Sequence, residues 1–249
     1  MWFATPVTDF EGRPGGALVV GGSGAIGSAT AVLLRERGAR VGVTFRSTPV
    51  EWDPSWQLDL TDDVACAAVV GEAAERLGGL HTLVYASGPH VPMRHLSRID
   101  PAEMRAQLDQ DAAAFFAVAH AALPALRESR GSIVAVTTAA TARFPVRDGL
   151  SSAPKAAVEA IVRGLAVEEG RYGVRANGVG PGMLSDGMAA RLMESGELDE
   201  RALAATTANI PLRRFGSAAD VAEAVCFLAS DRAGFISGQK LDVDGGYTA

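Results

Sequence analysis

The most informative stretch of this chain is Leu18-Val19-Val20-Gly21-Gly22-Ser23-Gly24-Ala25-Ile26-Gly27. Three apolar residues that favour β-structure precede a Gly-x-Gly-x-x-Gly spacing, inside which a helical pattern over Ala25–Arg37 begins. Glycines between a strand and a helix permit a tight turn and let backbone N–H groups approach a pyrophosphate, which the helix N-terminus attracts. A purely structural turn is the alternative. The motif predicts cofactor contacts at Gly21, Ser23, Gly24, Ile26 and Gly27.

Strand patterns and helical patterns alternate from this turn to the end of the chain. The expected strands are Ala17–Val20, Val41–Phe45, a short one before Asp59, Thr82–Ala86, Ser132–Thr138, Val174–Val179 and Gln239–Val243. The expected helices are Ala25–Arg37, Thr61–Arg76, Pro101–Leu126, Ser151–Glu169 and Ala218–Ala229. This order predicts a single-domain α/β Rossmann fold, a doubly wound parallel sheet of about seven strands with helices on both faces. We expect a tail at 1–14, one domain over 15–249 and a substrate lid at 184–209.

Composition excludes several other classes of protein. The chain has 249 residues, 48% of them hydrophobic, and a net charge of −6, so it is too apolar for disorder. It has no basic stripe, which disfavours a nucleic-acid partner. Cys66 and Cys226 stand alone in apolar helical patterns, so we expect two buried thiols, no disulfide and no metal site. Neither a signal peptide nor a membrane-spanning run is evident, so we expect a soluble cytoplasmic protein without a membrane partner.

The end of the second expected strand carries positive charge where an NAD enzyme would place an acidic residue. Arg46 is followed by the hydroxyl residues Ser47 and Thr48. Together they suit a ribose 2′-phosphate and favour NADP(H), whereas a solvated surface arginine is the alternative. Asp59 is placed to accept a hydrogen bond from an adenine amine, or else to cap a helix N-terminus.

From about Gly15 to Tyr247 the sequence resembles the short-chain dehydrogenase/reductase family. The resemblance rests on the glycine turn, on Asp59, on Asn177 in an Arg-x-Asn-x-x-x-Pro-Gly stretch and on the C-terminal 238–246. It implies an oxidoreductase that uses NADPH/NADP+ or NADH/NAD+ and assembles as a homo-oligomer, a tetramer or dimer. It also implies further cofactor contacts, which are Leu60, Ala86, Ser87, Gly88, Pro181, Gly182 and Leu184.

The resemblance is incomplete where the family carries its catalytic groups. The family's active-site Asn is Asp111 here, its catalytic Ser is Thr138, and the Tyr of its Tyr-x-x-x-Lys pair is Ser151. Lys155 is retained, and it is one of only two lysines, the other being Lys240. None of Tyr85, Tyr172 and Tyr247 has the spacing of the missing tyrosine.

The retained and missing groups suggest which chemistry survives. The resemblance implies that Lys155 binds the nicotinamide ribose, and Asp111 is placed to pair with it; a surface lysine and an exposed helix carboxylate are the alternatives. Serine is a poor general acid because its pKa lies far above working pH. A ketone yields an alkoxide whose conjugate acid has a pKa of ~16, whereas a quinone yields a phenolate with a pKa of ~10. The difference is worth up to ~8 kcal/mol, so a quinone needs the acid least.

These observations predict an NADPH-dependent reductase of a quinone or a conjugated aromatic carbonyl, in which Thr138 and Ser151 only orient the oxygen. The chain's richness in alanine and arginine resembles that of reductases that tailor aromatic polyketides in secondary metabolism. An apolar wall around a flat substrate is expected, although ordinary core packing is the alternative. Its members are Phe144, Pro145, Met183, Leu184, Met188 and Met193.

Other functions remain open from the sequence alone. His90, or less favourably His95, has an unperturbed pKa of ~6.5 and is a candidate acid for an ordinary ketoreductase. A cofactor-binding regulatory protein and a non-redox cyclase or dehydratase are further alternatives. Family members assemble through the two helices expected at Pro101–Leu126 and Ser151–Glu169, whose alanines would allow close packing between subunits. These are Ala112, Ala113, Ala114, Ala117, Ala156, Ala157 and Ala160.

Overall fold

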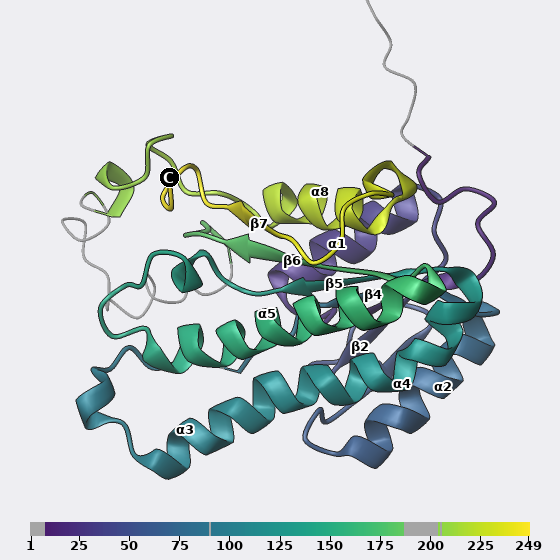
Figure 1. Cartoon of the computed structure of the whole chain (residues 1–249), viewed down its shortest axis with the longest axis horizontal. Helices are drawn as coiled ribbons and strands as arrows, with labels where there is room; N and C mark the ends of the chain where they lie inside the picture. The colour runs from purple at the N-terminus through teal and green to yellow at the C-terminus, as the bar shows by residue number, and fades with distance from the viewer. Residues whose placement is uncertain (1–7, 90, 187–203, 205) are drawn as a thin grey trace, which may run out of the picture.

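The structure, a computed structural model, describes residues 8–89, 91–186, 204 and 206–249. One parallel sheet of seven strands in the order β3-β2-β1-β4-β5-β6-β7 runs through the molecule (Figure 1). Its strands are β1 (Gly16–Val20), β2 (Val41–Phe45), β3 (Ser55–Gln57), β4 (Leu80–Tyr85), β5 (Ser132–Val136), β6 (Arg175–Pro181) and β7 (Lys240–Val243). The strand order reverses between β1 and β4, as in a doubly wound fold. The predicted Rossmann fold is confirmed.

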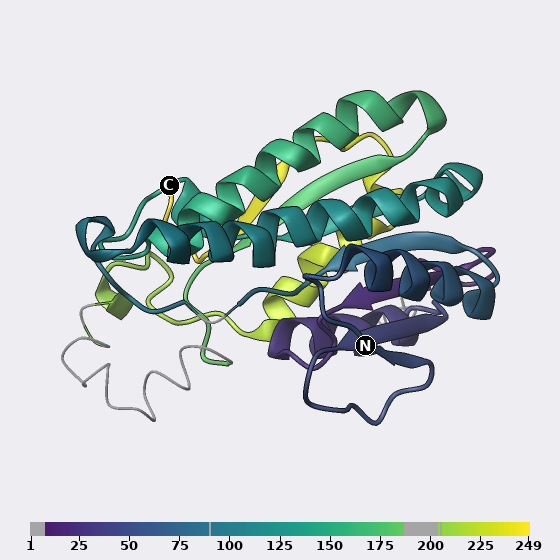
Figure 2. The ribbon, with the colours of Figure 1, turned by 90° about the horizontal axis from the view of Figure 1, so that it is seen from below.

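Helices cover both faces of this sheet. On one face lie α1 (Ala25–Glu36) and α8 (Ala218–Ala229), which pack against each other, and on the other lie α2 (Asp63–Leu77), α4 (Ala114–Ser129) and α5 (Gly149–Glu169) (Figures 1 and 2). The strands feed both layers because their side chains alternate. On β1, Ala17 and Val19 join the core under α1 and α8, whereas Leu18 and Val20 join the core under α2 and α4.

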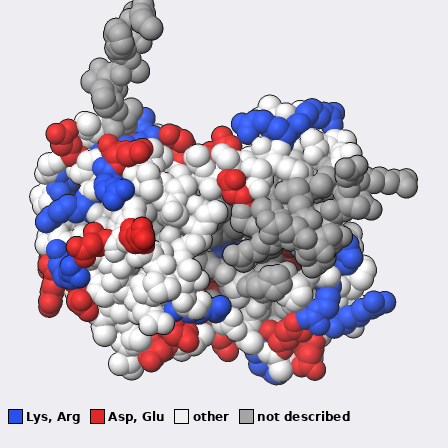
Figure 3. All heavy atoms as spheres, turned by 180° about the vertical axis from the view of Figure 1, so that it is seen from behind, with Lys and Arg blue, Asp and Glu red and all other residues white. Residues whose placement is uncertain are grey.

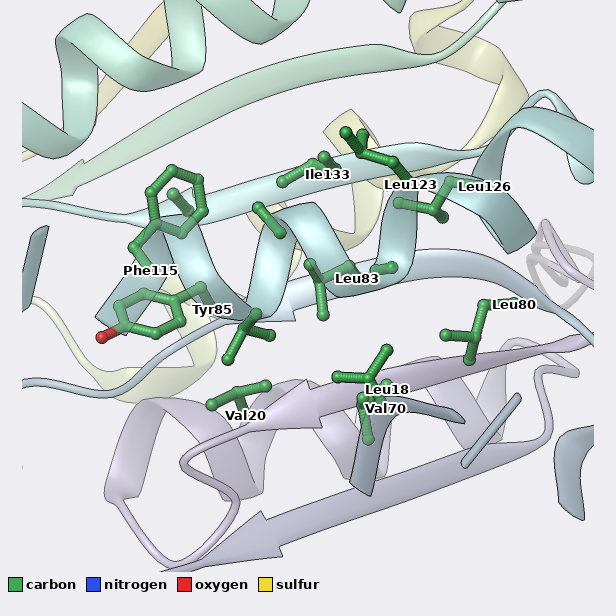
Figure 4. Packing of buried hydrophobic residues seen from close by; sticks show 14 of the residues in the cluster. Leu18, Val20, Val70, Leu80, Leu83, Tyr85, Phe115, Leu123, Leu126 and Ile133 are labelled. Carbon is green, nitrogen blue, oxygen red and sulfur yellow. The ribbon is translucent and has the colours of Figure 1, made fainter. Parts of the chain in front are cut away.

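The larger core reaches the carboxyl ends of the strands, where the turn with the glycine motif lies. Figure 4 shows Tyr85, the last residue of β4, beside Phe115 of α4, and their ring centroids are 5.2 Å apart in an edge-to-face arrangement. The Tyr85 hydroxyl donates a hydrogen bond to the backbone carbonyl of Asp111 at 3.2 Å. Tyr85 is therefore a packing residue. Cys66 and Cys226 are both fully buried and form no disulfide, so the prediction of two buried free thiols is confirmed.

The helix expected over Pro101–Leu126 is in fact three segments. It consists of α3 (Pro101–Leu108), a π-helical turn (Asp109–Ala113) and α4. A π turn inserts one residue into the helical repeat and is frequent at functional sites. Asp111 lies within this π turn and is only 3% exposed.

Smaller differences concern the short and irregular segments. β3 has three residues and follows a cis Asp53–Pro54 bond. Within the predicted tail, Phe10 is buried and stacks on His81 of β4. Most of the predicted lid, 187–203 and 205, lies outside the described residues, and its beginning is attached to the body where Ser185 N–H donates to the Gly216 carbonyl at 2.8 Å.

The described surface carries charges of both signs. On the face shown in Figure 3, acidic and basic side chains lie near one another around the rim. No helix among the described residues is long and apolar enough to cross a membrane.

We expect the protein to lose stability between about pH 7 and pH 5 because of His81. Burial, with a contribution from the charge of Arg13, lowers the pKa of His81 from 6.5 to about 4. The unfolded chain binds a proton near pH 6.5 and the folded chain resists it, so stability falls as the pH drops through this window. The loss is about 2 kcal/mol. Urea unfolding at pH 7 and pH 5 measures this loss of free energy. In His81→Asn the free energy of unfolding should depend less on pH. The same dependence on pH in both proteins would contradict the assignment to His81.

Candidate active site

The turn between β1 and α1 has the geometry that a bound diphosphate requires. Gly21 has a φ of 90°, and a Cβ on Gly27 would lie 2.2 Å from the Gly21 carbonyl oxygen, so neither position tolerates a side chain. The N-cap residue of α1 is Gly24, and no side chain caps this end of the helix. Its first N–H groups are therefore available to an anion, and exposed Ser23 and half-buried Ile26 flank them. The turn thus fits the dinucleotide that the sequence predicts.

The adenosine end of the predicted cofactor site lies at the end of β2. Arg46, Ser47 and Thr48 are exposed there. The carboxylate of Asp59 accepts hydrogen bonds from Thr61 N–H at 3.0 Å and Thr61 Oγ1 at 2.8 Å. These bonds, with a smaller effect of Arg46, lower the pKa of Asp59.

Asp59 does not cap a helix, so that alternative is wrong. The N-cap of α2 is Asp62, whose side chain accepts from Ala65 N–H at 2.9 Å. Leu60, next to Asp59, is half-buried.

Lys155 is held by three groups at the inner end of the site. Its Nζ donates to Asp111 Oδ1 at 2.9 Å and to the Ser87 carbonyl at 3.1 Å, and it lies 5.6 Å from the centre of the Tyr85 ring. The Lys155 and Asp111 side chains are 11% and 4% exposed. The expected pairing is confirmed, and the alternatives of a surface lysine and an exposed carboxylate are wrong. The loop after β4 lies close to the ammonium, since a Cβ on Gly88 would be 3.5 Å from Nζ.

Thr138 follows β5 with its hydroxyl still able to donate. Thr138 Oγ1 accepts a hydrogen bond from Ala140 N–H at 3.1 Å and caps a short 3₁₀ helix, Ala139–Thr141. A hydroxyl that accepts one bond keeps its proton for another partner. The side chain is half-buried, as a group that orients a substrate oxygen would be.

Lys240, the second lysine, anchors the same loop. From β7 its Nζ donates to the Thr138 carbonyl at 3.3 Å and to Thr141 Oγ1 at 2.7 Å, and it pairs with Asp242 Oδ1 at 2.9 Å. Glu159 Oε1 lies 3.5 Å away. Sequence reasoning missed this cluster, and the rarity of lysine was the only signal for it.

Ser151 lies in the first turn of α5. It is half-buried and one helical turn before Lys155, so the two residues share a face of the helix. The N-cap residue Asp148 accepts a hydrogen bond from Ser152 Oγ at 2.7 Å on its carboxylate and one from Ser151 N–H at 3.1 Å on its backbone carbonyl. Asp148 was not predicted as a site residue; an aspartate just before an expected helix was its only signal.

The remaining predicted residues are only partly brought together. Gly182 and Ala86 follow β6 and β4 at the same edge of the sheet, with Pro181 buried as the last residue of β6. Of the predicted apolar wall, Phe144 is 56% exposed and Pro145, Met183 and Leu184 are half-buried. His90, Met188 and Met193 lie outside the described residues, and His95 is exposed.

Comparison with known proteins identifies the family of the chain. Residues 21–248 match the family model described as enoyl-(acyl carrier protein) reductase. The cis-4-hydroxycyclohexanecarboxylate dehydrogenase of Sinomonas cyclohexanicum is 36% identical, over 94% of this chain and 96% of that protein. The versicolorin reductase of Emericella nidulans is 31% identical over 92% and 94%.

Among solved structures, a short-chain type dehydrogenase/reductase from Mycobacterium ulcerans superposes with a TM-score of 0.87 at 26% identity. The match covers 96% of this chain and 90% of that one. A Rossmann fold of this kind implies a nicotinamide cofactor. The chain belongs to the short-chain dehydrogenase/reductase family of oxidoreductases.

Proposed function

We propose that this protein is an NADPH-dependent reductase of quinones or conjugated aromatic carbonyls, of the polyketide type, in secondary metabolism. The observation that carries the proposal is that a serine, Ser151, stands four residues before Lys155, whose ammonium is paired with Asp111. The cation is retained with its side chain 11% exposed and paired with Asp111, whereas the acidic hydroxyl expected beside it is absent. This combination favours substrates whose oxygen needs little help from an acid.

The dinucleotide, when bound, supplies the hydride. The uncapped N-terminus of α1 and the glycine turn bind its diphosphate, and Arg46 with Ser47 binds the 2′-phosphate. The Asp59 carboxylate accepts a hydrogen bond from the adenine amine. Lys155, held in place by Asp111 and Ser87, donates to the ribose hydroxyls next to the reacting ring.

Thr138 and Ser151 orient the substrate oxygen by donating hydrogen bonds. Neither hydroxyl is acidic enough to deliver a proton efficiently at neutral pH. A quinone tolerates this because the negative charge that develops on its oxygen is delocalised as a phenolate, with a conjugate-acid pKa of ~10. The similarity to a versicolorin reductase supports an aromatic substrate, and Met183 and Leu184 supply apolar surface beside the site.

Anaerobic NADPH consumption tests the proposal directly. We expect oxidation of NADPH with hydroxylated naphthoquinones and anthraquinones at rates at least about 10²-fold above those with simple cyclic ketones. Equal turnover of the ketones would instead indicate an ordinary ketoreductase with a relocated acid. Binding of NADPH without oxidation by either set would indicate a regulatory or non-redox protein.

Arg46→Ala is expected to raise the KM for NADPH about tenfold and leave the KM for NADH unchanged. A charge-assisted bond to the 2′-phosphate contributes about 1.5 kcal/mol, and NADH has no phosphate to lose. Arg35→Ala is the control, because it removes the same charge from a residue that packs on the Trp52 ring, 4.1 Å from the ring centre, and has no proposed role at the 2′-phosphate. An equal change for both dinucleotides would contradict the assignment of Arg46.

We extend the proposal to a homo-oligomer assembled through α4 and α5. Phe116 on α4 and Val167 on α5 are 51% and 82% exposed, and they would supply apolar surface to such an interface. Ala112 and Ala114 are buried within the protomer and cannot contribute, contrary to expectation, whereas Ala113, Ala156 and Ala160 are exposed and Ala117 and Ala157 are half-buried. Light scattering after size exclusion distinguishes a tetramer or dimer from a monomer.

A further inference from the structure

A cluster of polar side chains lies where β7 and α5 meet the loop that follows β5. Lys240 of β7 stands between two carboxylates, with Asp242 Oδ1 at 2.9 Å and Glu159 Oε1 of α5 at 3.5 Å. Its Nζ also donates to Thr141 Oγ1 at 2.7 Å and to the Thr138 carbonyl at 3.3 Å. The three charged side chains are no more than 20% exposed. Charges shielded in this way are screened less than surface pairs, so the cluster is expected to keep a defined geometry.

The Thr141 hydroxyl joins this cluster to α5. It has one proton to donate, and the carboxylate of Glu159 at 2.7 Å is a stronger acceptor than the Thr138 carbonyl at 3.0 Å. Thr141 therefore donates to Glu159 and accepts from Lys240 on its oxygen. Through Lys240 and Thr141, the backbone carbonyl of Thr138 is tied to α5.

The same helix carries the other hydroxyl of the site. Glu159 stands one helical turn after Lys155, which stands one turn after Ser151, so the three residues share a face of α5. At the other end of the link, Thr138 Oγ1 accepts from Ala140 N–H at 3.1 Å, so the side chain and the backbone of Thr138 move together. A shift of the Thr138 carbonyl would therefore move its hydroxyl relative to Ser151.

The backbone of β6 makes room for the cluster. A Cβ on Gly180 would lie 2.1 Å from Asp242 Oδ1 and 3.2 Å from the Thr138 carbonyl oxygen, so any other residue there would displace the carboxylate and the loop. The two lysines of the chain have similar surroundings. Lys155 and Lys240 each pair with a carboxylate at 2.9 Å and donate to the carbonyl of a loop that follows a strand.

We propose that Lys240 is a positioning residue, which holds the Thr138 hydroxyl at the place that the substrate oxygen requires relative to Ser151. This rests on the proposed function, in which both hydroxyls donate to that oxygen. Lys240 acts on the reaction only through Thr138, because its ammonium is already engaged by the loop and by the two carboxylates. Misplacing an orienting group by about 1 Å can slow a reaction by about 10²-fold.

Lys240→Met keeps most of the length of the side chain and removes the ammonium. We expect the single-turnover rate of NADPH oxidation by a quinone to fall about tenfold, with the Kd for NADPH unchanged. Thr138→Ala removes the hydroxyl itself and should slow the reaction at least as much. In the double variant the loss of Lys240 should cause no further slowing, because the group that it positions is already gone.

Thr141→Val tests the same link without a change of charge. It removes the hydroxyl between Lys240 and Glu159, and it leaves the ammonium and both carboxylates in place, so it serves also if Lys240→Met fails to fold. We expect a smaller loss of rate than in Lys240→Met, again with an unchanged Kd for NADPH. The loss should disappear when Thr141→Val is combined with Thr138→Ala.

Arg175→Met is the matched control. Arg175 is a half-buried cation that donates to the carbonyls of Leu228 at 2.7 Å and Ser230 at 2.9 Å. It begins β6, at the edge of the parallel sheet opposite the candidate site. Its loss should lower the free energy of unfolding and leave the rate of NADPH oxidation unchanged.

A second readout does not depend on turnover. In protein with ¹³C-labelled threonine methyl groups, the resonance that Thr138→Ala removes should shift or broaden in Lys240→Met and Thr141→Val, and stay unchanged in Arg175→Met. An unchanged Thr138 resonance in all three, or equal slowing by Lys240→Met with and without the Thr138 hydroxyl, would overturn the positioning role. Absence of quinone reduction in the wild type would overturn the proposed function instead, and the Thr138 resonance would still decide the role of Lys240.

Discussion

Ser151→Tyr is expected to raise the rate of simple ketone reduction about 10²-fold, the usual contribution of a placed general acid. The new phenol would stand one helical turn before Lys155, whose Nζ is already fixed by Asp111 and Ser87. A nearby cation favours the ionised phenol and lowers its pKa, so the tyrosine becomes a competent proton donor. The half-buried position of Ser151 leaves one side open for the larger ring.

Ser151→Phe is the control for this gain. It introduces the same ring without the hydroxyl, so any change that it shares with Ser151→Tyr comes from shape alone. Quinone reduction should change little in either variant beyond the effect of the added bulk. If Ser151→Tyr folds, binds NADPH and still leaves simple ketones untouched, position 151 does not face the reacting oxygen.

Asp111→Ala is expected to lower the free energy of unfolding by about 3 kcal/mol. The Asp111 and Lys155 side chains are 4% and 11% exposed, so the substitution leaves a nearly buried ammonium without its counter-charge. For a chain of this size the loss corresponds to a melting temperature lower by roughly 6–12 °C. The Ser87 carbonyl still accepts a bond from Nζ but does not neutralise it.

The double variant Asp111→Ala, Lys155→Met separates the charge from the packing. Removing both charges should recover at least half of the lost stability, because the cost lies mainly in the unpaired ion. Urea unfolding of the wild type, both single variants and the double variant completes the cycle. If the stability losses of the two single variants simply add in the double variant, the 2.9 Å contact between Lys155 and Asp111 contributes no interaction free energy to the folded protein.

Local sequence was sufficient to predict the parts of the site that depend on backbone geometry. The glycine turn needs Gly21 at a positive φ and Gly27 without a Cβ, and both demands are visible as residue types at fixed spacing. The pairing of Asp111 with Lys155 was expected only because the family resemblance placed the two positions in one site.

Other features depend on contacts that no periodic pattern encodes. The hydrophobic pattern of 101–126 reads as one helix, because a single inserted residue at the π turn hardly disturbs it. Lys240 reaches Thr141 across 99 residues of sequence, and Asp148 meets Arg94 through a bridge between two loops. In each case a long-range contact determines the role of the residue.

The most direct test of the proposed function is the rate of hydride transfer as a function of the basicity of the product oxygen. Single-turnover oxidation of bound NADPH should be followed by stopped flow with quinones, aryl ketones and simple ketones, whose product pKa values span ~10 to ~16. Without a tyrosine to supply the proton, the rate should fall steadily along this series. Rates independent of the product pKa would contradict the proposed function, since they require a strong acid that already stands at the site.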